Sequence, residues 1–128
     1  MSISLKEAVQ TAIKLAEGET YLGGRVLLSG SLELSVIVGV NDERLPQDGQ
    51  RKWAKSLGGM LMNRYEGLVI YNEHRALVKE AAYWTDDECE WDSSCAWCQG
   101  FYYGTQGNSH KSAALRGVAV RRFTHSAI

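Results

Sequence analysis

Residues 83–104 read YWTDDECEWDSSCAWCQGFYYG, and this stretch carries most of the information about the fold. Most of its aromatic residues lie at its two ends, in Tyr83-Trp84 and in the run 96–103, and aromatic residues are typical of half-buried strands. Acidic, serine and cysteine residues separate the two runs and indicate a connecting loop. The stretch therefore predicts two short strands joined by a polar loop, and residues 118–123 predict a further strand downstream.

Two helices are expected immediately upstream. Residues 50–57 fit one helix, which the pair Gly58-Gly59 would end. A second helix opens at Asn63, because Asn63 and Glu66 have the spacing of a capping box, and it runs toward His74.

The N-terminal third has a different pattern. Apolar residues recur at helical spacing and predict a helix over residues 5–16. Residues 25–29 and 32–38 are β-rich runs around Gly30-Ser31 and predict a hairpin, and residues 40–48 are polar and predict a loop. The whole order indicates an α+β fold, with short helices packed on a small, mostly antiparallel sheet with long loops.

Length and charge exclude several classes of protein. With 128 residues the chain has the size of one domain, and we divide it into residues 1–45, the helix and hairpin, and residues 46–128. The first part is either an assembly arm or a portion of the same core. A net charge of -1 gives no general attraction to nucleic acid, and no apolar run approaches the roughly 20 residues that span a membrane. The N-terminus has no signal-peptide pattern, so we expect a location in a host cytoplasm or in a virion.

An ordered set of motifs resembles one known family, the Lcl C-terminal domain family. The motifs are the 83–88 stretch YWTDDE, Ala96-Trp97, Phe101, Gly104, Lys111-Ser112, the 116–123 stretch RGVAVRRF and, upstream, the 53–61 stretch WAKSLGGML followed by Arg64 and Glu66. Met62-Asn63 and Thr85-Asp86 stand where the family has Pro-Thr and Ser-Ser. The stretch from Gly18 to Gly23 is similar to the start of the short, free-standing versions that bacteriophages and prophages encode.

The resemblance implies a C-type-lectin-like fold, and it implies that certain residues form its framework. These are Trp84, Trp97, Phe101, Gly104 and Arg121. The fold supports unrelated functions, so function has to be argued from the side chains between the framework positions.

Loops at residues 85–95 and 102–112 are the expected binding face. Tyr and Trp dominate the energetics of protein interfaces, and polar side chains add hydrogen bonds. The candidate ligand-binding residues are Trp91, Tyr102, Tyr103, Gln106, Asn108, Ser109 and His110. The partner would be a protein or a surface glycan.

Three cysteines lie within ten residues, and Cys95 and Cys98 have the spacing of a zinc or redox pair. Zinc requires four ligands, however, and residues three apart in a strand point to opposite faces. An odd number of cysteines without a signal peptide argues against a disulfide framework. We therefore expect no metal and no disulfide.

The acidic run 86–92 leaves two alternatives open. Calcium binds six to eight oxygens from carboxylates and carbonyls, which such a run can supply. The sugar-binding C-type lectins use a Glu-Pro-Asn or Gln-Pro-Asp motif, whereas the only proline here is Pro46. We expect a solvated acidic loop and no cofactor, with a calcium site as the alternative.

No motif for hydrolase, transferase or phosphate-binding chemistry occurs in the sequence. We therefore predict a non-enzymatic, bacteriophage-encoded binding module, associated with the tail or capsid of the virion and present in several copies or as part of a larger assembly. It would recognise a host surface or another virion protein. The alternative is an intracellular inhibitor of a host defence protein or signalling molecule.

Overall fold

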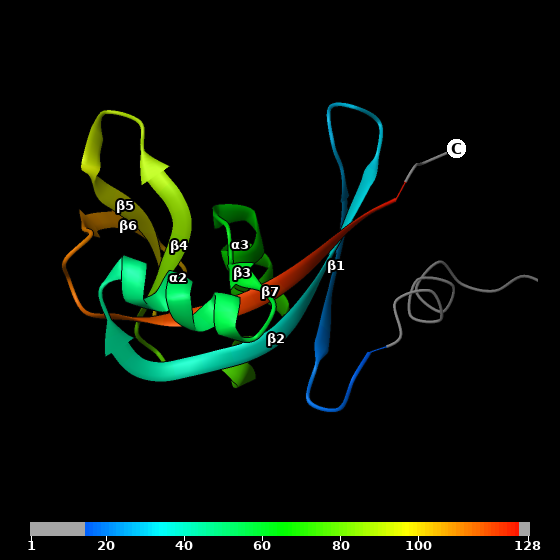
Figure 1. Ribbon diagram of the computed structural model, residues 1–128, viewed down its shortest axis with the longest axis horizontal. Helices are drawn as coiled ribbons and strands as arrows, with labels where there is room; N and C mark the ends of the chain where they lie inside the picture. The colour runs from blue at the N-terminus through cyan, green and yellow to red at the C-terminus, as the bar shows by residue number, and fades with distance from the viewer. Residues whose placement is uncertain (1–14, 126–128) are drawn as a thin grey trace, which may run out of the picture.

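The structure, a computed structural model, describes residues 15–125 (Figure 1). Its elements, in chain order, are β1 (Thr20–Val26), β2 (Leu32–Leu45), α2 (Gln47–Ser56), β3 (Met60–Leu61), α3 (Arg64–Glu73), the 3-10 turn η1 (Arg75–Leu77), β4 (Ala82–Cys89), β5 (Asp92–Gly100), β6 (Gln106–His110) and β7 (Leu115–His125). The predicted α+β class is confirmed.

A mostly antiparallel sheet organises the described residues. It has seven strands in the order β1-β2-β7-β4-β5-β6, and β3 pairs separately with β7. The longest ladder joins β2 to β7, from the Leu32–His125 pair to the Leu45–Leu115 pair, and Figure 1 shows these two strands running side by side. Only the β4–β7 contact is parallel, at the Tyr83–Arg116 pair. Strands far apart in sequence therefore form the centre of the sheet.

Strand alternation produces two cores on opposite faces of this sheet. Val118 and Val120 of β7 pack in a cluster with Ile70 of α3, whereas Ala119 between them packs in a second cluster with Ala54 of α2. Successive residues of a strand point to opposite faces, which explains the division. Helix α3 therefore covers one face and α2 covers the other.

The capping box at the start of α3 is confirmed. The Glu66 N–H donates to Asn63 Oδ1 at 2.8 Å, and the Asn63 N–H donates to Glu66 Oε1 at 2.8 Å. The first turn of α3 is thus held by its own sequence, and this places Arg64 and Tyr65 at a defined position on the sheet face.

The helix predicted for residues 50–57 is α2, which begins three residues earlier, directly after Pro46, and is followed by Gly58 with φ +76°. The loop predicted for residues 40–48 is wrong, because β2 continues to Leu45. Its polar residues remain in the strand since Asn41 pairs with Gly117 in the ladder with β7. Tertiary pairing overrides a low strand propensity.

The predicted hairpin is present, with its turn at residues 27–31, but its first strand lies earlier than expected, at Thr20–Val26. The helix predicted for residues 5–16 falls, except for its last two residues, outside the described part of the chain.

The predicted loops at 85–95 and 102–112 are wrong in large part. Strand β4 extends to Cys89, β5 begins at Asp92, and residues 106–110 form β6. Asp86 lies where the β4–β5 ladder is irregular, and its N–H donates to the Met62 carbonyl at 2.9 Å while its Oδ1 lies 2.6 Å from Arg51 Nε. The strand expected over 96–103 ends at Gly100, and the one expected over 118–123 lies within β7.

Candidate functional site, a polar hollow at the first turn of helix α3

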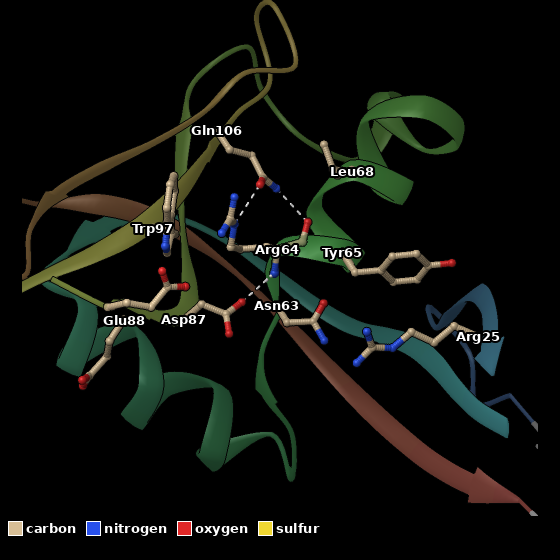
Figure 2. A pocket seen from close by; sticks show the side chains of 10 residues that line it. Arg25, Asn63, Arg64, Tyr65, Leu68, Asp87, Glu88, Trp97 and Gln106 are labelled. Carbon is tan, nitrogen blue, oxygen red and sulfur yellow. Dashed lines mark hydrogen bonds between the residues drawn. The ribbon is translucent and has the colours of Figure 1, made fainter. Parts of the chain in front are cut away.

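An open hollow of about 460 Å³ lies where β5 and β6 meet the start of α3 (Figure 2). Its volume is within the range of small-ligand sites. We call it the Arg64 hollow, and it is lined by Arg25, Asn63, Arg64, Tyr65, Leu68, Asp87, Glu88, Glu90, Trp97 and Gln106. Strands β1, β4, β5 and β6 and helix α3 all contribute to it.

Arg64 lies at the centre of the hollow. Its guanidinium carbon is 3.7 Å from the centre of the Trp97 ring, and its Nε donates to Gln106 Oε1 at 3.0 Å. Figure 2 shows the guanidinium between the indole and the amide. Within residues 15–125 the two Nη groups have no hydrogen-bond partner, so the stacked guanidinium keeps free donors for a ligand.

The side-chain amides of Gln106 and Gln99 hold Arg64 in this position. Gln106 Nε2 donates to the Arg64 carbonyl at 2.7 Å and to Gln99 Oε1 at 2.9 Å. Gln99 is fully buried and lies directly against Gly67, where a Cβ would be 3.0 Å from its Oε1. Helix α3 approaches β5 this closely because residue 67 has no side chain.

Carboxylates form the opposite wall. Asp87 Oδ2 accepts from the Arg64 backbone N–H at 2.8 Å, so this carboxylate sits at the positive end of α3. Lys111 donates to Glu88 Oε1 at 2.6 Å, and this hydrogen bond lowers the pKa of the Glu88 carboxyl below its ordinary value. Glu90 is exposed at the rim. The hollow therefore combines one free guanidinium with several acceptors.

Trp91 extends the aromatic surface outward. It is 62% exposed and packs edge-on against Trp97, with ring centres 5.6 Å apart. The Trp97 Nε1 is buried and has no hydrogen-bond partner within the described residues. An exposed tryptophan next to a fixed, stacked arginine is the composition of an interface hot spot.

The predicted ligand-binding residues do not gather at one place. Gln106 lines the hollow and Trp91 lies beside it, while Asn108 and His110 are the β6 partners of Trp97 and Cys95. Ser109 pairs with Ala96, which belongs to the α2-side core, and therefore lies on the other face.

Tyr102 and Tyr103 lie in the turn after β5, whereas Trp91 lies in the turn before it. Both tyrosines are exposed, at 57% and 76%, and they pack edge-on against each other. They line neither the Arg64 hollow nor the smaller hollow beside β1. The tyrosine pair is thus a separate surface.

The framework residues have different surroundings. Trp84 and Phe101 are buried, and Gly104 adopts φ +75° against Tyr71. Arg121 pairs with Glu19, its Nη2 2.9 Å from Oε1, and so joins β7 to the residue before β1. Trp97 is only half-buried and forms a wall of the hollow, so it contributes to the site as well as to the fold.

Of the lining residues, the sequence predicted only Gln106 as ligand-binding, and it did not assign Arg64, Tyr65 or Asp87 to a site. The capping box already placed Arg64 and Tyr65 in the first turn of a helix, which was an available signal. That this turn would face Trp97 depends on the pairing of β5 with β6, which the sequence does not state. The acidic run predicts a solvated loop at Asp87, but this residue is half-buried and hydrogen-bonded to α3.

The three cysteines are free thiols. Burial raises the pKa of Cys98 and of Cys89, while Cys95 is half-exposed on the opposite face of β5 from Cys98. Within residues 15–125 no three His, Cys, Asp or Glu side chains are grouped so that they could hold a metal ion.

No protein-family model matches the chain, and no curated protein sequence matches it. Among the helices of the described part, none has the length and apolarity needed to cross a membrane.

Proposed function

We propose that the chain is a non-enzymatic, bacteriophage-encoded recognition module with a C-type-lectin-like fold, and that the Arg64 hollow with Trp91 at its edge is the ligand site. The observation that carries the proposal is the stacked pair of Arg64 and Trp97, which leaves both Nη groups of the guanidinium free at an open hollow.

The proposed fold is supported by the arrangement of the strands. β2 and β7 pair along most of their length, and the two helices and the β4–β5–β6 strands all lie between them in sequence. Apart from Arg25 of β1, the residues that line the hollow lie between β2 and β7 in sequence, where loops and short strands can vary without changing the central ladder.

A binding role is supported by how the lining side chains are held. Gln106 holds Arg64, Asp87 holds the first turn of α3, and Glu88 is paired with Lys111. Each group is fixed by its neighbours before a ligand arrives. Preorganised polar groups around an aromatic surface reduce the entropy lost on binding.

The experiment separates the two candidate surfaces. The full chain is immobilised as wild type, as Trp91→Ala/Arg64→Gln, and as Tyr102→Ala/Tyr103→Ala, and the components retained from host envelope extract are compared by mass spectrometry. We expect the first double variant to lose the specific component at least roughly tenfold, equivalent to about 1.4 kcal/mol, because hot-spot side chains are removed. If only the tyrosine variant loses this component, and circular dichroism is unchanged in both variants, the Arg64 hollow is not the ligand site.

The place of action has two candidates. Attachment to the virion tail or capsid would allow several copies to act together. An intracellular inhibitor of a host defence protein or signalling molecule is the second, and the three free thiols favour it because a reducing cytoplasm maintains thiols. Mass spectrometry of purified virions distinguishes them: stoichiometric amounts of the chain support the virion role, and its absence supports the inhibitor.

A further inference from the structure

A second hollow along α3 adjoins the Arg64 hollow. This second hollow has a volume of about 210 Å³ and lies between α3 and strands β1 and β2. Arg25 and Tyr65 line both hollows, and the Arg25 guanidinium carbon is 5.3 Å from the centre of the Tyr65 ring. Figure 2 shows this pair at the end of the first hollow that lies away from Trp97. The two hollows therefore adjoin at the Arg25–Tyr65 pair, and together we call them the α3 groove.

The α3 groove contains more carboxylates than guanidinium groups that belong to no ion pair. Within residues 15–125, the Glu73, Asp87 and Glu90 carboxylates belong to no ion pair, whereas the other acidic side chains of the groove are paired with cations. Arg64 is the one arginine of the groove that has no acidic partner in the described part of the chain. The groove thus has three carboxylates outside ion pairs, of which Asp87 is hydrogen-bonded to the first turn of α3, and a single free guanidinium.

The wall of the second hollow is open at Gly23, where a Cβ would meet nothing within 4 Å and φ is +123°. Gly24 also lines this hollow, but it is covered by β2, because a Cβ there would lie 2.7 Å from Leu34 Cδ2. The register of β1 against β2 shifts between Tyr21 and Gly23. Glycine within a strand marks places where another chain can approach closely.

We propose that the α3 groove binds an extended basic peptide segment, which is the partner class for the recognition site and rests on the proposed function. Lysine or arginine side chains of the segment pair with Glu73, Asp87 and Glu90. Its backbone carbonyls accept hydrogen bonds from the free Nη groups of Arg64. A peptide fits better than a compact ligand, because the carboxylates are distributed over two adjoining hollows.

The test uses pentalysine as the probe, titrated into the isotope-labelled full chain and followed by NMR. We expect the signals of the Gly23 and Gly24 amides and of the Trp97 indole N–H to shift together, and the affinity to fall with added salt. Pentaglutamate and spermine serve as comparison probes. Tighter binding of pentaglutamate would overturn the charge assignment, and equal binding of spermine at the same signals would overturn the peptide assignment.

Two double variants with equal net charge test whether the carboxylates of the groove bind the peptide. Glu73→Gln/Glu90→Gln removes two exposed carboxylates of the groove, and Glu43→Gln/Glu80→Gln removes two exposed carboxylates elsewhere. We expect the first variant to weaken pentalysine binding roughly tenfold and the second to leave it unchanged. Equal weakening in both, or no shift of the groove signals in the wild type, overturns the proposal.

The two proposals fail in different ways. If pentalysine does not bind the groove while Trp91→Ala/Arg64→Gln still loses its envelope component, the partner class is wrong and the recognition site remains. If that variant also retains the component, the proposed site itself is wrong.

Discussion

Gly104 has a backbone conformation and a neighbour that both require glycine. Its φ is +75°, and a Cβ at this position would lie 2.4 Å from Cε2 of Tyr71. We expect Gly104→Ala to lower the free energy of unfolding by about 2 kcal/mol or more, because left-handed strain and a steric overlap add together. Urea denaturation followed by tryptophan fluorescence measures the change.

Gly107 provides the matched control for that substitution. A Cβ there meets nothing within 4 Å, so Gly107→Ala should change the unfolding free energy by no more than about 0.5 kcal/mol. Equal effects of the two substitutions would contradict the role assigned to Gly104.

The three thiols should differ in reactivity. The thiolate is the nucleophile, and burial raises the pKa of Cys89 and Cys98 while it also restricts access to their sulfur atoms. Cys95 is half-exposed. We expect iodoacetamide to modify Cys95 at least roughly tenfold faster than the other two in the native protein, measured by timed quenching and peptide mass spectrometry.

Denaturation supplies the control for this prediction, since all three cysteines should react at similar rates in concentrated urea. Rapid native modification of Cys89 or Cys98 would mean that the hairpin of β4 and β5 opens.

At the scale of elements, one ion pair connects α3 to the centre of the sheet. The Arg122 guanidinium of β7 donates to both carboxylate oxygens of Glu66, at 2.9 and 2.8 Å, and Ser35 of β2 donates to the same carboxylate at 2.6 Å. Burial alone would lower the pKa of Arg122, but the hydrogen bonds and charge of Glu66 raise it above its ordinary value. Three elements therefore depend on one buried carboxylate.

We expect Arg122→Met to lower the free energy of unfolding by about 3–5 kcal/mol, because it leaves the Glu66 carboxylate buried without its cation. The Lys52–Asp48 pair is the comparison, with both side chains about four-fifths exposed, at 80% and 78%. Lys52→Met should change stability by at most about 0.5 kcal/mol. Guanidinium chloride denaturation of both variants measures the two changes in unfolding free energy. A similar loss of stability in the two would refute the role assigned to the Arg122–Glu66 pair.

At the scale of the whole molecule, the β2–β7 ladder should make the first strands part of one cooperative unit. Val36, Ile37 and Val120 are buried in its centre. We expect their amide protons to exchange only through global unfolding, while those of Leu28 and Ser29 at the hairpin turn exchange without protection. Native-state hydrogen exchange measures both. Exchange of all β1 and β2 amides at a common, lower free energy would show instead that residues 1–45 form a separate unit.

Local signals in the sequence predicted part of this arrangement. The capping box at Asn63 and Glu66, the glycine after α2 and the aromatic runs near Trp84 and Trp97 all predicted elements that are present. Such signals act within about four residues, so they can be read directly from the chain. The extent of β2, the whole of β3 and β6, and the strand character of residues 85–89 were not predicted.

The α+β class, the starts of the helices and the turn chemistry were determined by the sequence itself, because hydrophobic period, caps and glycines act locally. The tertiary structure decided which side chains meet. Strands β2 and β7 lie some 80 residues apart in the chain, and their pairing sets the positions of β4, β5 and α3. Together with the pairing of β5 and β6, the β2–β7 pairing brings Arg64 onto Trp97 and gives the acidic residues Asp86 and Asp87 their partners, since such contacts depend on backbone register and not on residue type.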